Sequence, residues 1–467
     1  MTLNLNYVNR IKEINHIAIP LIANSIAGLS IKLVDQAMIG RISVEAYGAI
    51  GVVSSLLFTI AGILGVLSVT FNIYGSRSIG QGDTKTFNDY FISSIFLNIM
   101  IGSLLTLLIL VFQRPLMSIV FGFEGNILED SLQYLPIMSV YIFIQLLLFT
   151  FSTFFKIIKD TKWIFLGSTV ASVMNVVLNY LLIFGNFGFP QLGIKGSAIA
   201  TVMALTTNLM IYVYLCRKHL RITFANFKIY INNVKFICNK SISLVGQEIL
   251  EGGIFIIAVN AMIARIGDLQ LSGYLLVSQI LSIILIPMYM YSSSILTLVS
   301  EKYGTKQLID LREYPRITLG LTMLFYLFLS IIFVGFKYEV ATFITNDNNL
   351  IHYAASILFF IILANVFNPL HNVYKYALQA IGQSDYVLIK TAIVNLMTLF
   401  IMLISIFILQ LNLFGVLISL FINYLVLSII FKNKYMDILE GITSNSEAAS
   451  KNRVCCLWHH KNVGYGI

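Results

Sequence analysis

The chain has 467 residues, of which 58% are hydrophobic and only 11% are charged. Soluble domains carry roughly a quarter charged residues, so this composition excludes a soluble globular protein and indicates a membrane protein. The net charge of +9 is spread over short segments between apolar runs without a basic stripe, so it points to membrane topology and gives no support to a nucleic-acid partner.

Twelve apolar runs are each long enough to cross the ~30 Å hydrocarbon core of a bilayer as a helix. We therefore predict an all-α polytopic membrane protein whose surroundings are the lipid bilayer. A polar start precedes the first run, which continues at spanning length, so no cleaved signal peptide is expected. In chain order, the predicted spans are 14–38, 48–73, 90–112, 132–155, 163–185, 195–215, 241–264, 272–298, 314–336, 351–374, 386–409 and 412–431.

The distribution of Lys and Arg sets the expected orientation of these spans. With both termini in the cytoplasm, 24 of the 30 basic side chains fall in cytoplasmic segments and only five in outside loops. We therefore expect a multi-pass protein of a bacterial cytoplasmic membrane with both termini cytoplasmic. The four cysteines then lie at or beyond the cytoplasmic ends of spans, where no disulfide framework is expected.

The first span carries one acid and one base, Asp35 and Lys32, in an otherwise almost wholly apolar run. An ionisable residue inside the membrane is costly and is by default a candidate functional site. Asp35 either exchanges a proton or cation during transport or is neutralised by Lys32, three residues away on the same helix face. Pro20 frees a backbone carbonyl and permits a bend of this helix.

The fifth and sixth spans carry polar residues at helical spacing. Asn175 and Asn179 are four residues apart on one predicted helix face, as are Ser197 and Thr201 on the next. Together with Asp35, this all-oxygen set suits a hard cation such as Na⁺, or an acid that binds a proton. The alternative is that these amides and hydroxyls only join helices to one another.

The two halves of the chain contain a repeat. AMIGRISVEAYG at 37–48 is similar to AMIARIGDLQLSG at 261–273, an offset of 224 residues, and the turns after the second and fourth spans match their counterparts at nearly the same offset. Halves in the same orientation predict two pseudo-symmetric six-helix bundles with the transport cavity between them. The predicted divisions are a cytoplasmic N-terminus (1–13), an N-lobe (14–215), a cytoplasmic linker (216–240), a C-lobe (241–431) and a disordered cytoplasmic tail (432–467).

The seventh and tenth spans offer a second set of titratable groups. Glu248 and Glu251 are three residues apart, and repulsion between two close carboxylates favours proton binding to one of them or attracts a cation. Glu248 lies nearer the cytoplasmic end, where it could simply be hydrated. His371 in the tenth span could titrate, although one histidine near a helix end is more often a structural hydrogen-bonding group.

The tail and the missing motifs narrow the function further. Cys455, Cys456, His459 and His460 could bind a soft metal, but a frayed tail is the favoured interpretation, and we assign no metal site. The sequence has no G-x-x-x-x-G-K-[ST], H-E-x-x-H or G-x-S-x-G motif. We therefore expect no enzymatic activity and no cofactor beyond a coupling ion.

Taken together, the motifs resemble those of the multidrug and toxic compound extrusion (MATE) transporters over about residues 14–431. The features are Pro20 with D35xxMIG, IGQG after the second span, N175xxxN179YLLIFG in the fifth, LGIKGSAIAT leading into the sixth, and GQxxxE251xxxF in the seventh. The resemblance implies twelve helices in two lobes with a V-shaped cavity. It also implies export of organic, often cationic, compounds against Na⁺ or H⁺ influx.

The spacing of Pro20 and Asp35 is similar to that of the DinF-like branch of the family. That likeness implies a coupling set of Asp35, Asn175 and Thr201. Two departures weaken an N-lobe cation site, because Asn179 stands where that branch usually has an aspartate and Lys32 adds a positive charge beside the acid. Glu251 matches the helix-7 glutamate of another branch, so the coupling site lies at either acid or is split between the lobes.

We therefore predict a secondary active antiporter, acting as a monomer, that exports small organic compounds or a secondary metabolite in exchange for H⁺ or Na⁺. One alternative is a flippase for lipid-linked saccharides, whose cavity needs many bases, yet Lys32 is the only base well inside a predicted span. A dedicated exporter of one compound is also compatible. A membrane-embedded enzyme fits least, since no clustered nucleophile or metal-ligand set is present.

Overall fold

The computed structural model describes residues 2–40, 44–217 and 227–461, without the side chains of 2–5, 30–36, 44–46, 227–228 and 445–461. All regular structure in these segments is helical. The first half comprises α1 (Thr2–Ile39), α2 (Val44–Gly80), α3 (Thr84–Pro115), η1 (Leu116–Val120), α4 (Gly125–Ile157), α5 (Lys162–Phe184), η2 (Asn186–Gly188) and α6 (Ile194–Cys216).

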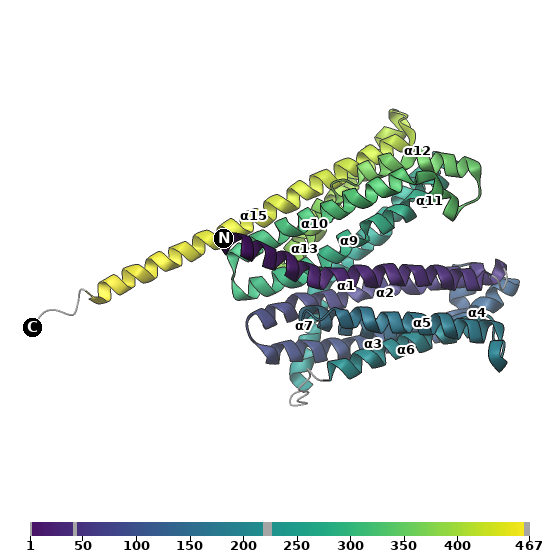
Figure 1. Ribbon diagram of the computed structural model, residues 1–467, viewed down its shortest axis with the longest axis horizontal. Coiled ribbons are helices and arrows are strands. Elements are labelled where there is room, and N and C mark those ends of the chain that lie inside the picture. The colour runs from purple at the N-terminus through teal and green to yellow at the C-terminus, as the bar shows by residue number, and fades with distance from the viewer. Residues whose placement is uncertain (1, 41–43, 218–226, 462–467) are drawn as a thin grey trace, which may run out of the picture.

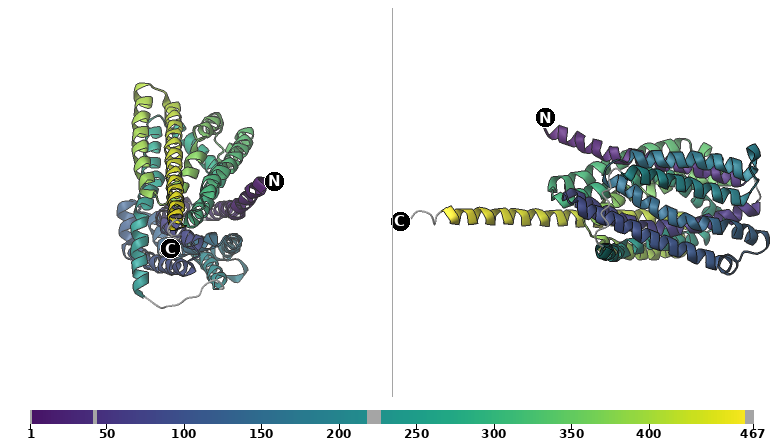
Figure 2. Two further views of the ribbon diagram at one scale, coloured as in Figure 1. Left: turned by 90° about the vertical axis from the view of Figure 1, so that its left-hand side faces the viewer. Right: turned by 90° about the horizontal axis from the view of Figure 1, so that it is seen from below.

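The second half has the same plan with more interruptions. It comprises α7 (Phe227–Glu248), η3 (Ile249–Phe255), α8 (Ile256–Ala264), α9 (Asp268–Thr305), α10 (Leu308–Gly335), α11 (Lys337–Ile344), α12 (Asn348–Ala364), α13 (Asn368–Ala380), α14 (Ser384–Leu403), η4 (Ile404–Ile408) and α15 (Asn412–Lys461). The two halves meet at the end where α1 begins and spread apart towards the other end (Figure 1). The start of α1 and the last described turns of α15 lie at the same end of the molecule (Figure 2).

Length and apolarity identify the membrane-crossing helices. Among the described residues, ten helices pass both criteria, and the pair α12 and α13, bent by 42° at the break between them, makes an eleventh. The remaining predicted crossing, 14–38, falls on helix α1, part of which has no described side chains. The predicted all-α polytopic fold is therefore confirmed, with the tenth span broken where the sequence had indicated a continuous run.

The internal repeat is visible in how the lobes meet. Helix α2 crosses α9 at Gly80 and Gly304, which are 224 residues apart, the offset of the sequence repeat. A Cβ on Gly80 would lie 2.2 Å from the carbonyl oxygen of Glu301, and one on Gly304 would lie 2.4 Å from that of Arg77. Arg77 and Glu301 are themselves 224 residues apart, so the two contacts are related by the repeat. The crossing therefore lies on the pseudo-twofold axis of the molecule.

The predicted linker is shorter than expected, because α7 begins at Phe227 and not at residue 241. The first turns of this helix pack on the N-lobe: Ile237 is buried with Leu67 of α2, and Ser241 shares a 2.7 Å hydrogen bond with Thr70. Because Lys and Asn are frequent in these turns, the sequence predicts a polar loop. In the structure the turns are helical, because the N-lobe covers one face of the helix. Residues 218–226 lie outside the described structure.

The predicted disordered tail is instead a continuation of α15, which is helical to Lys461. Tyr435 is fully buried and donates a 2.7 Å hydrogen bond to the carbonyl oxygen of Leu311, and Leu439 is 5% exposed. Apolar residues thus continue past the predicted end of the span and hold the helix against α10. The cysteine and histidine side chains considered for a metal lie outside the described part.

Candidate functional site

Three of the polar residues predicted for the N-lobe come together, whereas the buried Ser197 hydroxyl has no hydrogen-bond partner in the described structure. Asn179 Nδ2 donates to Asn175 Oδ1 at 3.2 Å, and Asn175 Nδ2 donates to Thr201 Oγ1 of α6 at 3.2 Å. Asn24 of α1 accepts a hydrogen bond from Ser168 and so joins the first helix to α5, the helix that carries the two asparagines. The spacing argument was therefore right about which side chains share a face, and these bonds also fit the structural alternative of joined helices.

Asp35 and Lys32 lie on α1, but their side chains fall outside the described residues. Pro20 lies inside α1, which continues as one helix from Thr2 to Ile39. The N-lobe assignment of the coupling site therefore stays a prediction.

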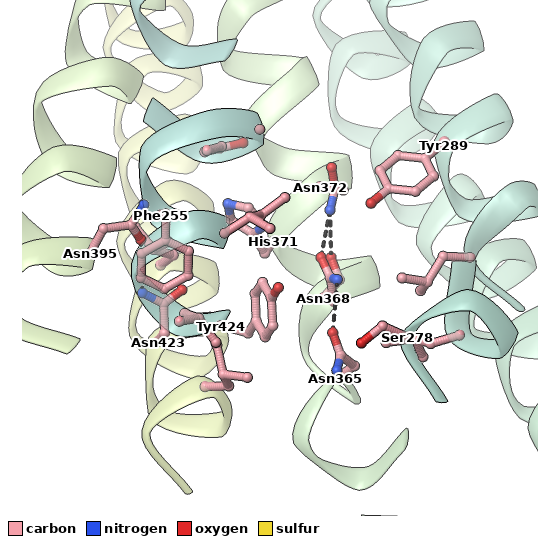
Figure 3. A pocket seen from close by; sticks show the side chains of 18 of the residues that line it. Phe255, Ser278, Tyr289, Asn365, Asn368, His371, Asn372, Asn395, Asn423 and Tyr424 are labelled. Atoms are coloured by element: carbon pink, nitrogen blue, oxygen red, sulfur yellow. Dashed lines mark hydrogen bonds between the residues drawn. The ribbon is translucent and has the colours of Figure 1, made fainter. Parts of the chain in front are cut away.

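A cavity of about 480 Å³ lies within the C-lobe (Figure 3). Its walls come from η3, α8, α9, the α12–α13 break, α13, α14 and α15. Six asparagines and four tyrosines line it: Asn260, Asn365, Asn368, Asn372, Asn395, Asn423, Tyr274, Tyr289, Tyr376 and Tyr424. A space with so many amides and phenols suits a polar ligand better than a purely apolar one.

An ion pair lies in the wall of this cavity. Lys375 Nζ is 2.8 Å from Glu251 Oε2, and the two side chains are 12% and 25% exposed. Glu251 also accepts a 3.0 Å hydrogen bond from Gln247, which in turn accepts one of 2.8 Å from Gln379. Burying either charge alone would be costly, whereas a hydrogen-bonded pair keeps both charges in place.

Local backbone irregularities position both partners. Glu251 sits in η3, a π-helical segment with Gly252 and Gly253, and single π-turns inside α-helices are frequent at functional sites. Lys375 sits on α13, which starts afresh after the break that follows Ala364 and carries Pro369 in its first turn. Proline lacks an N–H, so it is tolerated in the first turn of a helix but not in the interior.

An asparagine ladder bridges the break between α12 and α13 (Figure 3). Asn368 donates to Asn365 Oδ1 at 3.2 Å, and Asn372 donates to Asn368 Oδ1 at 2.6 Å. Asn365 in turn donates to the carbonyl oxygen of Ile361 at 3.0 Å. These amides bond polar groups near the break that the bilayer could not satisfy, which allows a bent span to persist in the membrane.

His371 faces the cavity without the structural hydrogen bond that the sequence suggested. Its side chain is 4% exposed, its ring lies 5.5 Å from that of Phe431, and neither ring nitrogen has a partner in the described structure. Asn372 Oδ1 is likewise buried without a partner. Buried polar atoms are normally hydrogen-bonded, so orphaned ones beside a cavity point to a ligand or water there.

Sequence reasoning missed Lys375 and found only part of this site. The predicted tenth span ends at 374 and leaves this residue in a cytoplasmic loop, whereas α13 continues to Ala380. Lys375 is four residues after His371 in NPLHNVYKYALQ, which places both side chains on one helix face. This spacing is the sequence feature that could have identified Lys375 as a residue of the site. Glu248, the predicted neighbour of Glu251, lines the same cavity with an exposed side chain.

The sequence matches the MatE family model at residues 20–181 and 245–404. The probable multidrug resistance protein NorM of Bacillus anthracis is 24% identical over 399 residues, covering 83% of this chain and 86% of that protein. The probable multidrug resistance protein YoeA of Bacillus subtilis is 21% identical over 351 residues, covering 73% and 74%. Each match thus spans most of both chains.

Two solved structures are similar in fold. A transporter of the MOP superfamily from Pyrococcus furiosus, described as having a binding pocket of reverse polarity, has a TM-score of 0.82 at 19% identity, covering 93% of this chain and 97% of that one. An outward-facing multidrug resistance transporter of the MATE family has the same score and identity, covering 93% and 96%. At this identity, the likeness establishes the twelve-helix arrangement alone.

Proposed function

Because the chain belongs to the MatE family, and its relatives include probable multidrug resistance proteins, we propose that it is an antiporter that couples export of organic compounds to H⁺ influx through Glu251. The observation that carries the proposal is the ion pair of Glu251 and Lys375 in the wall of a polar cavity. A carboxylate that can hold a proton, the lysine or a substrate cation provides the mutually exclusive binding that antiport requires.

The choice of H⁺ over Na⁺ follows from how closely Lys375 occupies the space beside the Glu251 carboxylate. Lys375 already neutralises Glu251 at 2.8 Å. A sodium ion at the same carboxylate would have to displace a covalently tethered ammonium group and would bring two positive charges together. A proton instead neutralises the carboxylate without occupying extra space. Proton coupling is therefore the form of antiport that this pair supports best.

The runner-up places coupling at Asp35 in the N-lobe. The hydrogen-bonded row of Asn179, Asn175 and Thr201 favours it, because the two asparagines lie on α5, which packs beside α1, and Thr201 lies on α6, which packs on α5. In that case Lys32 would modulate the charge of the acid. Lys375 is one buried base of the kind that the flippase alternative requires, but it is already paired with Glu251. A single positive charge is also too little for a cavity that would have to hold a pyrophosphate.

The lobes' arrangement suggests which step of the cycle this conformation represents. Contacts between the lobes gather at the end that holds the start of α1, and the lobes spread apart at the other end (Figure 1). With the termini in the cytoplasm, as the distribution of Lys and Arg predicts, the open end faces outward. We propose that the protein works as a monomer in a bacterial cytoplasmic membrane.

The test is efflux of ethidium from proteoliposomes that contain the purified protein, driven by a pH gradient or by a Na⁺ gradient. We expect the pH gradient alone to drive efflux, Glu251→Gln to abolish it, and Asp35→Asn to retain it. Loss with Asp35→Asn alone would move the coupling site to the N-lobe. Efflux driven by Na⁺ alone would reject proton coupling.

A further inference from the structure

We propose that the C-lobe cavity binds zwitterionic substrates, which carry an ammonium group and a carboxylate and insert between Glu251 and Lys375. This inference rests on the proposed function, since it names the substrate class that would compete with the proton at Glu251. In the bound state, the substrate ammonium pairs with Glu251 and the substrate carboxylate pairs with Lys375. One internal ion pair is thereby exchanged for two pairs with the substrate.

Because both charges lie in one wall, a ligand with a single charge fits this site less well than a ligand that carries both charges. A monocation at Glu251 would leave the Lys375 ammonium, 12% exposed, without its partner. A monoanion at Lys375 would leave Glu251 unpaired in the same way. Truncating one side of a buried ion pair is strongly unfavourable because the remaining charge has lost its hydration. A zwitterion is the only one of the three classes that leaves neither charge alone.

The other charged group of the cavity does not change this conclusion. Glu248 lines the cavity one turn before Glu251, with an exposed side chain. In the described structure, Glu251 is the acid within ion-pair distance of Lys375. Glu248 therefore adds an attraction for the substrate ammonium at the edge of the cavity, and Lys375 still needs a carboxylate when Glu251 turns to the substrate.

The neutral lining also favours a polar substrate. His371 lies one turn before Lys375 on α13, is buried, and has no hydrogen-bond partner for either ring nitrogen. Its N–H can donate to the second oxygen of a carboxylate held by Lys375. Asn372 Oδ1, also orphaned, can accept from an amide or ammonium N–H. A lipophilic cation would leave these atoms unsatisfied, whereas a zwitterion with amide or hydroxyl groups bonds them.

Proton coupling then has a direct electrical consequence. Protonation of a Glu251 oxygen removes the partner of the substrate ammonium and weakens binding on the side where protons are abundant. One neutral zwitterion leaves for each proton that enters, so one positive charge moves inward per cycle. Exchange of a monocation for one proton would move no net charge. A membrane potential that is negative inside therefore accelerates export of a zwitterion and not of a monocation.

Three related fluorescent probes separate these classes: Nα-dansyl-lysine, which is zwitterionic, its methyl ester, which is a cation, and its Nε-acetyl derivative, which is an anion. Binding to the purified full-length protein is measured by fluorescence titration. We expect the zwitterion to bind at least tenfold more tightly than either derivative. Lys375→Gln should remove that preference by weakening zwitterion binding about tenfold, while ester binding is unchanged or stronger.

Two further variants make the result interpretable. Lys375→Arg keeps the charge and should keep the preference, even if Lys375→Gln fails to fold. Lys390→Gln removes a lysine of α14 that stacks on Tyr386 outside the cavity and should change nothing. A wild type that prefers the ester, or binds no dansyl probe while it exports ethidium, would overturn the zwitterion proposal and leave the antiporter standing. Failure to transport ethidium as well as the three dansyl probes in a pH gradient would overturn both proposals.

Discussion

At the level of single residues, the C-lobe cavity depends on a cation that the protein itself supplies. Lys375 is held by Glu251 at 2.8 Å and lies 5.5 Å from the ring centre of Tyr376. An ammonium group over an aromatic face gains electrostatic stabilisation from the ring. The lysine therefore occupies the space in which a transported cation would otherwise bind, which makes Glu251 selective for ligands that can displace an ammonium.

Removing this tethered cation should change the ion dependence of transport. In Lys375→Gln, Glu251 loses its partner and its carboxylate becomes available to Na⁺, as hard cations favour oxygen ligands. We expect ethidium efflux to become several-fold faster when Na⁺ replaces choline in the medium at constant pH, whereas the wild type does not respond. A Na⁺ response of equal size in both proteins would contradict the role given to Lys375.

At the level of helices, the crossing of α2 and α9 depends on two glycines. The backbones approach so closely at Gly80 and Gly304 that a methyl group at either position would overlap a carbonyl oxygen of the other helix. Both carbonyls belong to helix backbones, which cannot turn aside as a flexible side chain can. Small residues at helix crossings are the usual means by which membrane helices reach close contact. The backbones of α2 and α9 therefore come into contact at two residues that have no side chain.

Substitution of Gly80 tests this contact. We expect Gly80→Ala to destabilise the protein by about 1–3 kcal/mol, as for overpacking of a tight interface, and to slow efflux. Gly320→Ala is the matched control, because a Cβ there meets no atom within 4 Å and alanine favours a helix by roughly 0.5–1 kcal/mol. Thermal unfolding in detergent measures both. Equal melting temperatures for the two variants would show that the crossing tolerates a methyl group.

Helix-level features also mark the limit of what the sequence could predict. Hydropathy found the spans because a bilayer requires long apolar runs, and the four-residue spacing of Asn175 and Asn179 located real neighbours. The same method ended the tenth span before Lys375, since a charged residue lowers the average even where a partner on another helix neutralises it. Its partner is 124 residues away, and such pairing is set by how bundles pack.

At the scale of the whole molecule, salt bridges join the lobes at the end that holds the start of α1, and we call this set the terminal latch. Lys159, in the turn after α4, lies 2.6 Å from Glu13 of α1 and 2.7 Å from Glu301 of α9 in the other lobe. Arg10 of α1 lies 2.7 Å from Asp310 of α10. The latch thus joins α1 and the α4–α5 turn to α9 and α10.

The side chains of Glu13 and Lys159 in the terminal latch are both charged near neutral pH. Burial raises the pKa of Glu13, but hydrogen bonds from Lys159 and Tyr314 outweigh it and leave the pKa below 4.5. Burial lowers the pKa of Lys159, but Glu301 and Glu13 outweigh it and leave the pKa above 10.5. The stabilisation from Glu13 is therefore complete above pH 4.5 and is lost as the pH falls through the lowered pKa. That from Lys159 is complete below pH 10.5 and is lost as the pH rises through the raised pKa.

Reversing one charge of the latch should open that end of the molecule. In Lys159→Glu, three carboxylates would meet, so we expect a cysteine at Ser293, which faces Lys156 across the lobe interface, to react about tenfold faster with a soluble maleimide in a background without native cysteines. Adding Glu301→Lys restores an opposite-charge pair and should return the rate towards the wild type. Lys162→Glu, a reversal at an exposed lysine three residues on, should have no effect. Equal acceleration by Lys159→Glu and Lys162→Glu would mean that net charge, and not the latch, holds the lobes together.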